Sequence, residues 1–508
     1  MNLLAVPVAA PLAGAALCLF LSGSTRRARW ISGAVTHLMF VCAVQLVLVA
    51  VRGEVPVLRI GGWPQSFGIV FVLDRLSALM VLLATTTQTA TWWFAWGGAL
   101  RREEERNFFH PLFLMLCGAV NWTFLTADLF NLFVAFEILL ISSYVLLCLK
   151  PGSFSSREAT RFVALNALGG TLFLVGAGLT YGRYGSLNFA DLALRVRLDD
   201  PSWGTAALGT LFLIVFGLKA AVFPLFYWLP DAYPRVSPAV LPFFAGLLTK
   251  VGVYCLYRVF TFVFRIESDT WFSPLILGIA GATMIVGVLG ALSRWTVRNI
   301  LSFHIISQIG YMIFGLGLLS PLGLASGIFY ILHHILVKST LFLIGGQILL
   351  RTGVDDLRNL GGLARSQPLL SALFLAAAFS LAGVPPLSGF YGKFGLVIEG
   401  LAQGHVVYVI LSILTSLLTL ASMLKIWTYV FWGTPPDSVE NHSGSNATLV
   451  PIVCMTILSL AVALASGPLM ALAEDTGRQL LDGTDYIRAA LGEGAVERFA
   501  ELESRKGS

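Results

Sequence analysis

The chain contains little charge. Only 12% of its 508 residues are Asp, Glu, Lys or Arg, while 57% are hydrophobic. Soluble domains carry charge on about a quarter of their residues, so this composition excludes a large soluble domain and indicates a polytopic membrane protein. The net charge of +6 is therefore interpreted as basic loops facing the cytoplasm rather than a surface for nucleic acid.

Cysteine clusters and catalytic motifs are also missing from the sequence. The six cysteines stand singly within apolar runs, which argues against zinc, haem and iron–sulfur sites. No nucleophile elbow, phosphate-binding loop or dinucleotide fingerprint is present. We therefore expect no enzyme active site, no cofactor and no bound metal. The first apolar run lacks basic residues before it, so it predicts a retained span rather than a signal peptide.

Long apolar runs are abundant instead. A membrane-crossing helix needs about 20 apolar residues, and the runs predict an all-α protein with about fourteen transmembrane helices. The predicted spans are 2–22, 30–51, 70–97, 109–127, 128–149, 161–183, 205–229, 237–264, 273–293, 300–319, 322–350, 368–402, 404–432 and 448–472. Pro224 lies in the seventh and the Pro385-Pro386 pair in the twelfth, so both are predicted to be broken helices.

The distribution of arginine and lysine predicts the orientation. Basic residues gather in the loops after odd-numbered spans, as in Arg26, Arg27 and Arg29 after the first. The positive-inside rule then places both termini outside the cytoplasm of a bacterial cell (inner) membrane. The polar residues after Ala473 predict a surface amphipathic helix or a partly disordered tail.

An internal repeat is visible between the two halves. Thr171-Leu-Phe-Leu-Val-Gly176 returns as Thr340-Leu-Phe-Leu-Ile-Gly345, and Lys219 near Pro224 returns as Lys393 near the Pro385-Pro386 pair. The copies are five spans apart, which gives them opposite topology, the architecture of ion-coupled transporters. The predicted units are a three-helix segment at 1–108, inverted repeats at 109–264 and 273–432, and a last span with a polar tail at 448–508.

Five ionisable residues lie deep inside apolar runs: Glu137, Lys219, Lys250, Lys338 and Lys393. Each such residue costs several kcal/mol in the bilayer (roughly 2.5–3.5 on insertion scales), so the group indicates charge movement. Glu137 and Lys219 are predicted to form a switchable ion pair, with a static salt bridge as the alternative. His334 and Lys338 are four residues apart on one helical face and would extend a hydrated proton relay. His333 points away from them and is interpreted as structural.

Three further residues are weaker candidates for proton uptake or support. Asp231 would either gate uptake or cap a turn, and His304 and Gln308 would either bond to the relay or bridge helices. Lys425 lies near the end of its span, where snorkelling to the interface explains it. Asp74 is interpreted as an interfacial pair with Arg75.

These residues and their motifs resemble a known family. The segments Asp128–Glu137, Gly217-Leu-Lys219, Leu229-Pro-Asp-Ala-Tyr233, Leu247–Tyr254, His334 with Lys338, and Gly383–Lys393 are similar to the antiporter-like subunits shared by respiratory complex I, membrane-bound hydrogenases and Mrp cation/proton antiporters. The stretch Phe130–Tyr144 and a lysine at position 393 are similar to the D subunits of Mrp antiporters.

The resemblance implies fourteen spans with broken seventh and twelfth helices, and a proton relay of Glu137, Lys219, Lys250, His334, Lys338 and Lys393. It also implies a hetero-oligomeric complex of several subunits that exchanges sodium or another monovalent cation for protons. No carboxylate cluster forms a cation cage, so the cation path is expected in a partner subunit.

Two other functions stay open at this point. One is a proton-pumping subunit of complex I or a membrane-bound hydrogenase, which would use the same relay. The other is a membrane scaffold whose charged residues hold partner subunits together.

Overall fold

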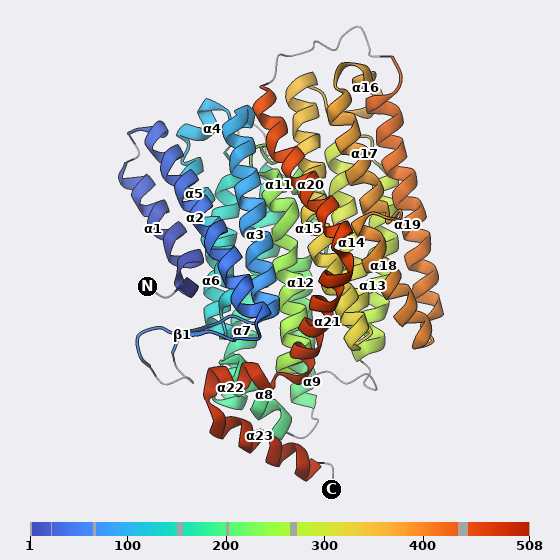
Figure 1. Ribbon diagram of the computed structural model, residues 1–508. Helices are drawn as coiled ribbons and strands as arrows, with labels where there is room; N and C mark the ends of the chain where they lie inside the picture. The colour runs from blue at the N-terminus through green and yellow to red at the C-terminus, as the bar shows by residue number, and fades with distance from the viewer. Residues whose placement is uncertain are drawn as a thin grey trace.

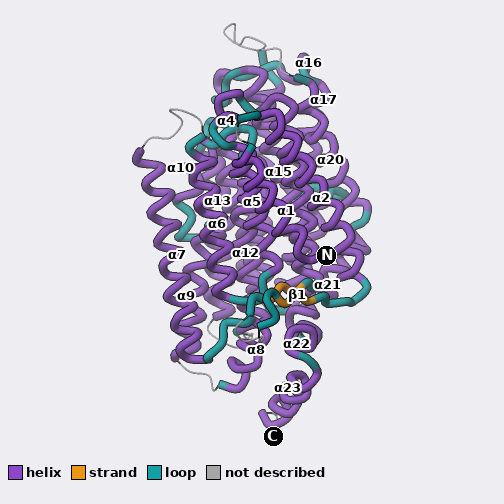
Figure 2. Tube along the Cα trace, turned by 90° about the vertical axis from the view of Figure 1, so that its left-hand side faces the viewer, coloured by secondary structure: helices purple, strands orange, loops and turns teal. Residues whose placement is uncertain are grey.

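The computed structural model is an upright bundle of helices that describes residues 3–21, 23–63, 68–149, 156–199, 203–264, 272–434 and 445–506 (Figure 1). The predicted units 1–108, 109–264 and 448–508 include a few residues outside these ranges. One end of the bundle carries α4 (Arg102–Arg106) and α16 (Leu363–Ser366), which contain Arg102, Arg106 and Arg365; we call it the Arg-rich end. Figure 2 shows the short strands and the C-terminal helices at the opposite end.

The first quarter of the chain forms three long helices and a hairpin. The elements are α1 (Val6–Phe20), α2 (Thr25–Val51), β1 (Val57–Arg59), β2 (Val70–Val72), α3 (Arg75–Phe94) and α4 (Arg102–Arg106). The strands pair antiparallel with Val57 opposite Val72. The side chain of Ser24 caps α2 and that of Asp74 caps α3, since each accepts a backbone N–H of the first turn.

The middle of the chain supplies the first broken helix. Its elements are α5 (Phe109–Leu125), α6 (Leu129–Leu147), α7 (Ser156–Tyr184), α8 (Phe189–Leu198), α9 (Trp203–Ala220), α10 (Trp228–Ala232), α11 (Leu241–Phe243), η4 (Phe244–Leu248), α12 (Thr249–Tyr257) and η5 (Arg258–Val263). Between α9 and α10 the backbone turns at Ala221, whose φ is 59°. The indole of Trp228 donates 2.9 Å to the Leu218 carbonyl, so the broken end stays hydrogen-bonded inside the membrane.

The second half supplies the other broken helix. Its elements are α13 (Phe272–Ser293), α14 (Val297–Gly317), α15 (Pro321–Thr352), α16 (Leu363–Ser366), α17 (Pro368–Ala382), α18 (Ser388–Ala402) and α19 (Val406–Ile426). The interruption lies between α17 and α18, where Gly383 has a φ of 88°. Both predicted breaks are thus confirmed. All residues from Gly323 to Ile348 of α15 are buried, which makes it the central helix of the bundle.

The membrane-crossing helices agree in position with the predicted runs. Eleven helices of the described residues are long and apolar enough to cross a membrane, and α5 and α17 are shorter apolar helices. The third predicted run, 70–97, begins in strand β2 and continues through α3, which is not among these eleven helices. The total of fourteen and the inverted relation of the two units stay predictions.

The C-terminal residues form an arm of four helices: α20 (Leu449–Leu464), α21 (Ser466–Asp482), α22 (Thr484–Leu491) and α23 (Glu493–Lys506). The arm crosses the front of the bundle in Figure 1, and α21 contacts α15. Gly477 permits this contact, because a Cβ there would lie 3.2 Å from the Pro321 carbonyl oxygen. Of the two predictions for the tail, helix rather than disorder is confirmed up to Lys506. Its first helix, α21, packs against the core rather than lying free on the surface.

A polar cluster fastens α2, α4 and α5 at the Arg-rich end. Arg29 donates two hydrogen bonds to Glu105, at 2.9 and 2.7 Å, and His110 lies 3.2 Å from the same carboxylate. Burial would raise the pKa of Glu105, but the hydrogen bonds from His110 and Arg29 outweigh it and hold that pKa below its ordinary value of 4.5.

The cluster gives a prediction for stability in acid. A carboxyl with a lowered folded-state pKa stabilises the fold above its unfolded value and loses that contribution as the pH falls through the folded pKa. The melting temperature of the purified protein should therefore fall as the pH is lowered beyond about 4.5. The Glu105→Gln variant should have a lower melting temperature at neutral pH and a weaker dependence of that temperature on pH in the acidic range. Glu103→Gln, at an exposed position of the same helix, should behave as the unmodified chain does.

Candidate functional site

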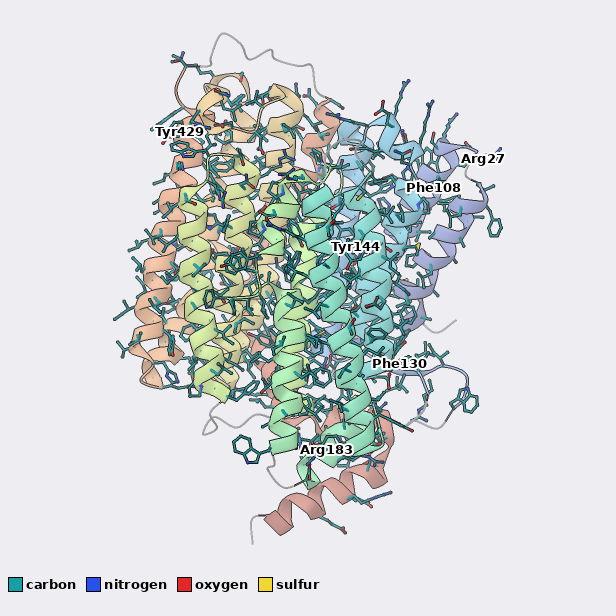
Figure 3. The ribbon with its side chains drawn as sticks, turned by 180° about the vertical axis from the view of Figure 1, so that it is seen from behind. Arg27, Phe108, Phe130, Tyr144, Arg183 and Tyr429 are labelled. Carbon is teal, nitrogen blue, oxygen red and sulfur yellow. The ribbon has the colours of Figure 1, made fainter. Side chains whose placement is uncertain are left out.

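Glu137 lies midway along α6, between Phe130 and Tyr144, which Figure 3 labels. Gly170 on α7 leaves space for the Glu137 carboxylate, because a Cβ at position 170 would lie only 2.4 Å from Glu137 Oε1. The residue is partly buried, with no hydrogen-bond donor to its carboxylate among the described residues. A carboxylate held this way is free to respond to a nearby charge.

Lys219 is the penultimate residue of α9, immediately before the first break. Its side chain is buried, and its ammonium lies 5.9 Å from the centroid of the Phe136 ring on α6. Glu137 and Lys219 act electrostatically on each other. Among the described residues they do not approach within the 4.0 Å of a direct ion pair. The two residues of the predicted pair therefore interact but form no direct salt bridge in this structure. A static salt bridge between Glu137 and Lys219 does not hold α6 and α9 together.

Lys250 lies on α12, which connects the Lys219 region to the middle of the bundle. Gly252 packs on the α9 backbone, since a Cβ there would lie 2.4 Å from the Ala220 nitrogen. Lys250 is fully buried and donates 2.9 Å to the Ala245 carbonyl in the π-helical turn η4. An irregular turn at this depth supplies a carbonyl that can accept the amine.

His334 and Lys338 face Lys250 from α15. Lys250 acts electrostatically on both of them. The ammonium of Lys338 and both ring nitrogens of His334 are buried and have no hydrogen-bond partner among the described residues, and the same holds for the Thr249 hydroxyl. Buried polar groups without protein partners normally bind water, so these groups fit hydration where α15 contacts the η4 turn that precedes α12.

Lys393 is on α18, just after the second break. Its ammonium donates 3.1 Å hydrogen bonds to the carbonyls of Leu381 and Ala382, the last residues of α17. A cation at the carbonyl end of a helix is favourably placed. It also lies 4.5 Å from the centroid of the Tyr311 ring. His333 joins the same region through a 2.8 Å hydrogen bond between its Nδ1 and Ser388, in keeping with a structural role.

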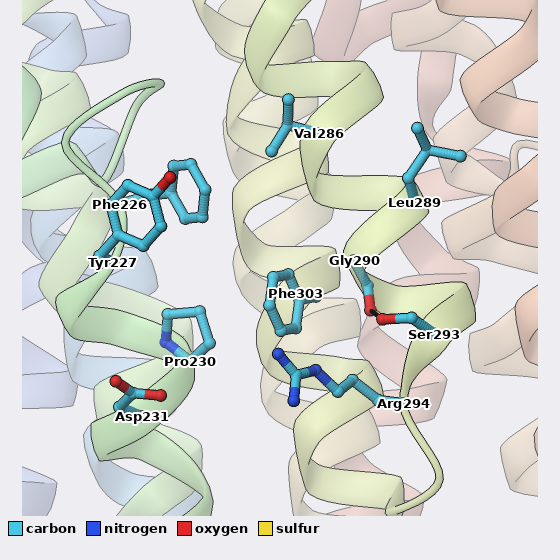
Figure 4. Close-up of a pocket in the computed structure, with 10 residues that line it drawn as sticks. All are labelled: Phe226, Tyr227, Pro230, Asp231, Val286, Leu289, Gly290, Ser293, Arg294 and Phe303. Atoms are coloured by element: carbon cyan, nitrogen blue, oxygen red, sulfur yellow. Dashed lines mark hydrogen bonds between the residues drawn. The ribbon is translucent and has the colours of Figure 1, made fainter.

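The three weaker candidates separate into two places. His304 and Gln308 lie fully buried on α14 and bond to side chains of α19. Asp231 lies in α10 with a half-exposed side chain that pairs with Arg161 at 3.7 Å. It borders a groove of about 420 Å³ with Phe226 and Tyr227 on one side and Arg294 on the other (Figure 4). Among the described residues no hydrogen bond joins Asp231 to the buried lysines.

Lys425 behaves as the sequence indicated. It is partly exposed near the end of its span, and its ammonium donates to the carbonyls of Leu292 and Arg294 at 3.0 and 2.7 Å. The described part of the chain contains no group of three His, Cys, Asp or Glu residues able to hold a metal ion.

The interpretation of Asp74 was wrong. Its carboxylate accepts bonds from Arg258 at 2.6 and 2.7 Å, and the two side chains are each only 2% exposed. Tyr486 of α22 covers the guanidinium at 5.1 Å. Arg75 instead contacts the arm, since its backbone N–H donates to Gln479. No local pattern signals a partner 184 residues away.

Comparisons with known proteins identify the family of this chain. Residues 126–419 match the sequence model of a family described as NADH:quinone oxidoreductase/Mrp antiporter, transmembrane. The chain belongs to this family. It is a multi-pass membrane protein, and the matched region contains the whole row from Glu137 to Lys393.

Individual relatives extend the similarity to nearly the full chain. The D subunit of a Na(+)/H(+) antiporter of Alkalihalophilus pseudofirmus is 39% identical over 97% of this chain and 100% of the relative. A chain in the structure of the Mrp complex from Dietzia sp. DQ12-45-1b is 34% identical, with a TM-score of 0.88 over 97% of this chain and 100% of that one. A chain of respiratory complex I from Thermus thermophilus shares the fold, with a TM-score of 0.80 at 24% identity over 95% of this chain and 100% of that one.

Proposed function

We propose that this chain is a proton-translocating subunit of a multisubunit antiporter that exchanges sodium, or another monovalent cation, for protons. The relatives at 34–39% identity carry that name or belong to an Mrp complex, and they align with this chain end to end. The other subunits of the complex are its partners. The chain acts as a transporter subunit and not as an enzyme.

The observation that carries the proposal is that Lys250, His334 and Lys338 are fully buried deep in the bundle, and that His334 and Lys338 have no hydrogen-bond partner among the described residues. Like charges in a medium of low dielectric repel strongly, so protonating one amine disfavours protonating the next. That coupling is what passes a proton along a row. Glu137 acts on Lys219 at one end of the row, and Lys393 stands at the other.

The orientation follows from the same proposal. With the Arg-rich end in the cytoplasm of a bacterial cell, both termini lie outside it. Lys393 would be the terminal proton site of the relay. The described residues contain no group of three carboxylates or other ligands for a metal ion, and we assign the cation path to a partner subunit.

A second function is supported by the shared fold with complex I, a redox-driven complex. The relay would then serve a proton pump whose energy comes from another subunit. The neighbouring genes separate the two: small hydrophobic antiporter subunits support the antiporter, and iron–sulfur or quinone-binding subunits support the pump.

Lys393→Ala tests the proposal directly. In everted vesicles with a fluorescent pH probe, the variant should reduce sodium-dependent dequenching several-fold, because the terminal amine is lost. Lys393→Arg keeps a charge near the α17 carbonyls but does not release protons, and should be impaired as well. Lys425→Ala, at the end of a span, is the matched control and should retain exchange. Full activity of Lys393→Arg would contradict a role in proton release.

A further inference from the structure

The groove beside Asp231 opens at the surface of the bundle between α10 and α13 (Figure 4). One wall belongs to the segment that follows the first break, and the other wall belongs to the end of α13 and to α14. Its lining is mostly apolar, with two charged side chains, Asp231 and Arg294. None of the buried lysines lines the groove, so the proton relay does not account for it.

The groove lies at the height where the membrane meets water. The candidate span of α13 ends at Ser293, and Arg294 follows it directly. The backbone N–H of Leu357, shortly before α16, donates 2.8 Å to the Trp295 carbonyl, so this end of α13 belongs to the Arg-rich end. From Ser293 the groove extends back to Val286, about 10 Å deeper along the helix. A ligand in the groove would therefore have a polar part at the interface and an apolar part inside the membrane.

The deeper part of the groove presents apolar surface. Leu289 is 52% exposed on α13, and Tyr227 is 66% exposed on the opposite wall. The Tyr227 ring stacks on the Phe226 ring at a centroid distance of 4.5 Å. Gly290 allows the Phe303 ring to pack against α13, because a Cβ at that position would collide with the ring. Aliphatic and aromatic groups thus line a slot that suits an acyl chain.

Arg294 and Asp231 lie on opposite walls of the groove (Figure 4). The Arg294 guanidinium lies 5.0 Å from the centroid of the Phe303 ring and has no hydrogen bond or ion pair among the described residues. Asp231 is half-exposed, and within the described part of the chain its one ion-pair partner is Arg161 at 3.7 Å. That distance exceeds the length of a hydrogen bond, so the carboxylate can still accept one. The groove therefore offers a guanidinium to an anion and a carboxylate to a cation.

We propose that this groove binds one zwitterionic phospholipid whose headgroup carries a primary ammonium, as that of phosphatidylethanolamine does. The phosphate accepts hydrogen bonds from the Arg294 guanidinium, whose planar fork suits two phosphate oxygens at once. The ammonium donates to Asp231, and the start of one acyl chain lies along Leu289. One molecule then neutralises both charges, whereas Asp231 would repel a headgroup of net negative charge. Basic pockets between transmembrane helices are typical sites for lipid headgroups.

The size of the groove favours a lipid over a helix of another subunit. An α-helix about 10 Å wide would occupy about 800 Å³ over a depth of 10 Å, more than the groove's volume of about 420 Å³. An acyl chain is narrower than a helix and follows an open slot. The binding does not depend on ion exchange, so its tests are independent of the proposed function.

The first test counts lipids retained by the purified, assembled complex in native mass spectrometry with phosphatidylethanolamine added. Arg294→Gln should weaken binding at this site by at least about tenfold, because charge-assisted hydrogen bonds are lost. The variant should therefore retain one lipid fewer for each copy of this chain. Leu289→Trp, which fills the apolar slot from an exposed position, should have the same effect.

The matched control for the first test is Arg365→Gln. Arg365 is an exposed arginine of α16 that does not line the groove, so its variant should retain as many lipids as the unmodified complex. Equal retention by Arg294→Gln and Arg365→Gln would overturn the proposal.

The second test identifies the headgroup. The complex should retain phosphatidylethanolamine in preference to phosphatidylcholine, whose quaternary ammonium has no N–H to donate, and to the anionic phosphatidylglycerol. Asp231→Asn should abolish this preference and strengthen binding of phosphatidylglycerol, because the repulsion of a negative headgroup is removed. A preference for phosphatidylglycerol in the unmodified complex, or an unchanged preference in Asp231→Asn, would overturn the assignment.

The third test separates a lipid from a protein partner in the intact membrane. A photoreactive benzoylphenylalanine in place of Leu289 should form an adduct with phospholipid on illumination. An adduct with another subunit would show that a protein segment occupies the groove, and the proposal would fail.

Discussion

Vesicles with Glu137→Ala or Lys219→Ala are expected to show no sodium-dependent dequenching, although the complex still assembles. The carboxylate acts on the lysine ammonium without closing a direct ion pair, so its removal changes the electrostatics while breaking no structural bond. The buried lysine would lose the negative charge that favours its protonated form. A fluorescent pH probe measures exchange, and co-purification of the other subunits measures assembly.

Lys219→Arg is the informative companion variant. Arginine keeps the positive charge but does not give up its proton, so exchange should fail as it does with alanine. A scaffold would tolerate arginine and would lose assembly with alanine. Assembly lost in Lys219→Ala and restored in Lys219→Arg would therefore favour the scaffold over the transporter.

Asp74→Asn and Arg258→Leu should each destabilise the folded chain by about 3–5 kcal/mol, because each leaves one member of a buried ion pair without its partner. Both side chains are 2% exposed and bonded twice to each other. The expected result is a steep fall in the amount of chain in the membrane and in the melting temperature of the purified complex.

Two controls test whether the loss of stability comes from a buried charge left without its partner. Replacing both partners with apolar residues removes the unpaired charge and should recover much of the loss. Arg358→Leu breaks an ion pair in which the arginine side chain is 63% exposed, and should change stability far less than Arg258→Leu does. Equal losses from Arg258→Leu and Arg358→Leu would contradict the role assigned to burial.

The helices and their breaks could be predicted because their signals are local. Apolar runs mark the spans, and the prolines near Lys219 and Lys393 mark where two of them break. The row of buried amines was also visible, since each lysine stands out within its own run. The positions of the spans, of their breaks and of the buried lysines can therefore be predicted from each segment of the sequence by itself.

Contacts between distant segments could not be predicted in the same way. Asp74 was assigned to the adjacent Arg75, yet its partner is Arg258, which lies 184 residues further along the chain at the start of η5. Likewise His304 and Gln308 were visible as candidates, but the α19 serines and threonines that bond to them resemble ordinary helix-packing residues. The distance between Glu137 and Lys219 also depends on packing. The sequence predicted that the two residues lie near each other but not whether they form a direct ion pair.

The position of the C-terminal arm has a consequence for biosynthesis. Helix α20 contacts α3 and α15, and α22 contacts α8 and β2, so the arm touches elements from early and late in the chain. These residues leave the ribosome last, and until they do, the Arg258 guanidinium lacks the Tyr486 ring, although Asp74 and the ring of Tyr254 already lie against it. A prematurely terminated copy would keep that charge accessible at its surface.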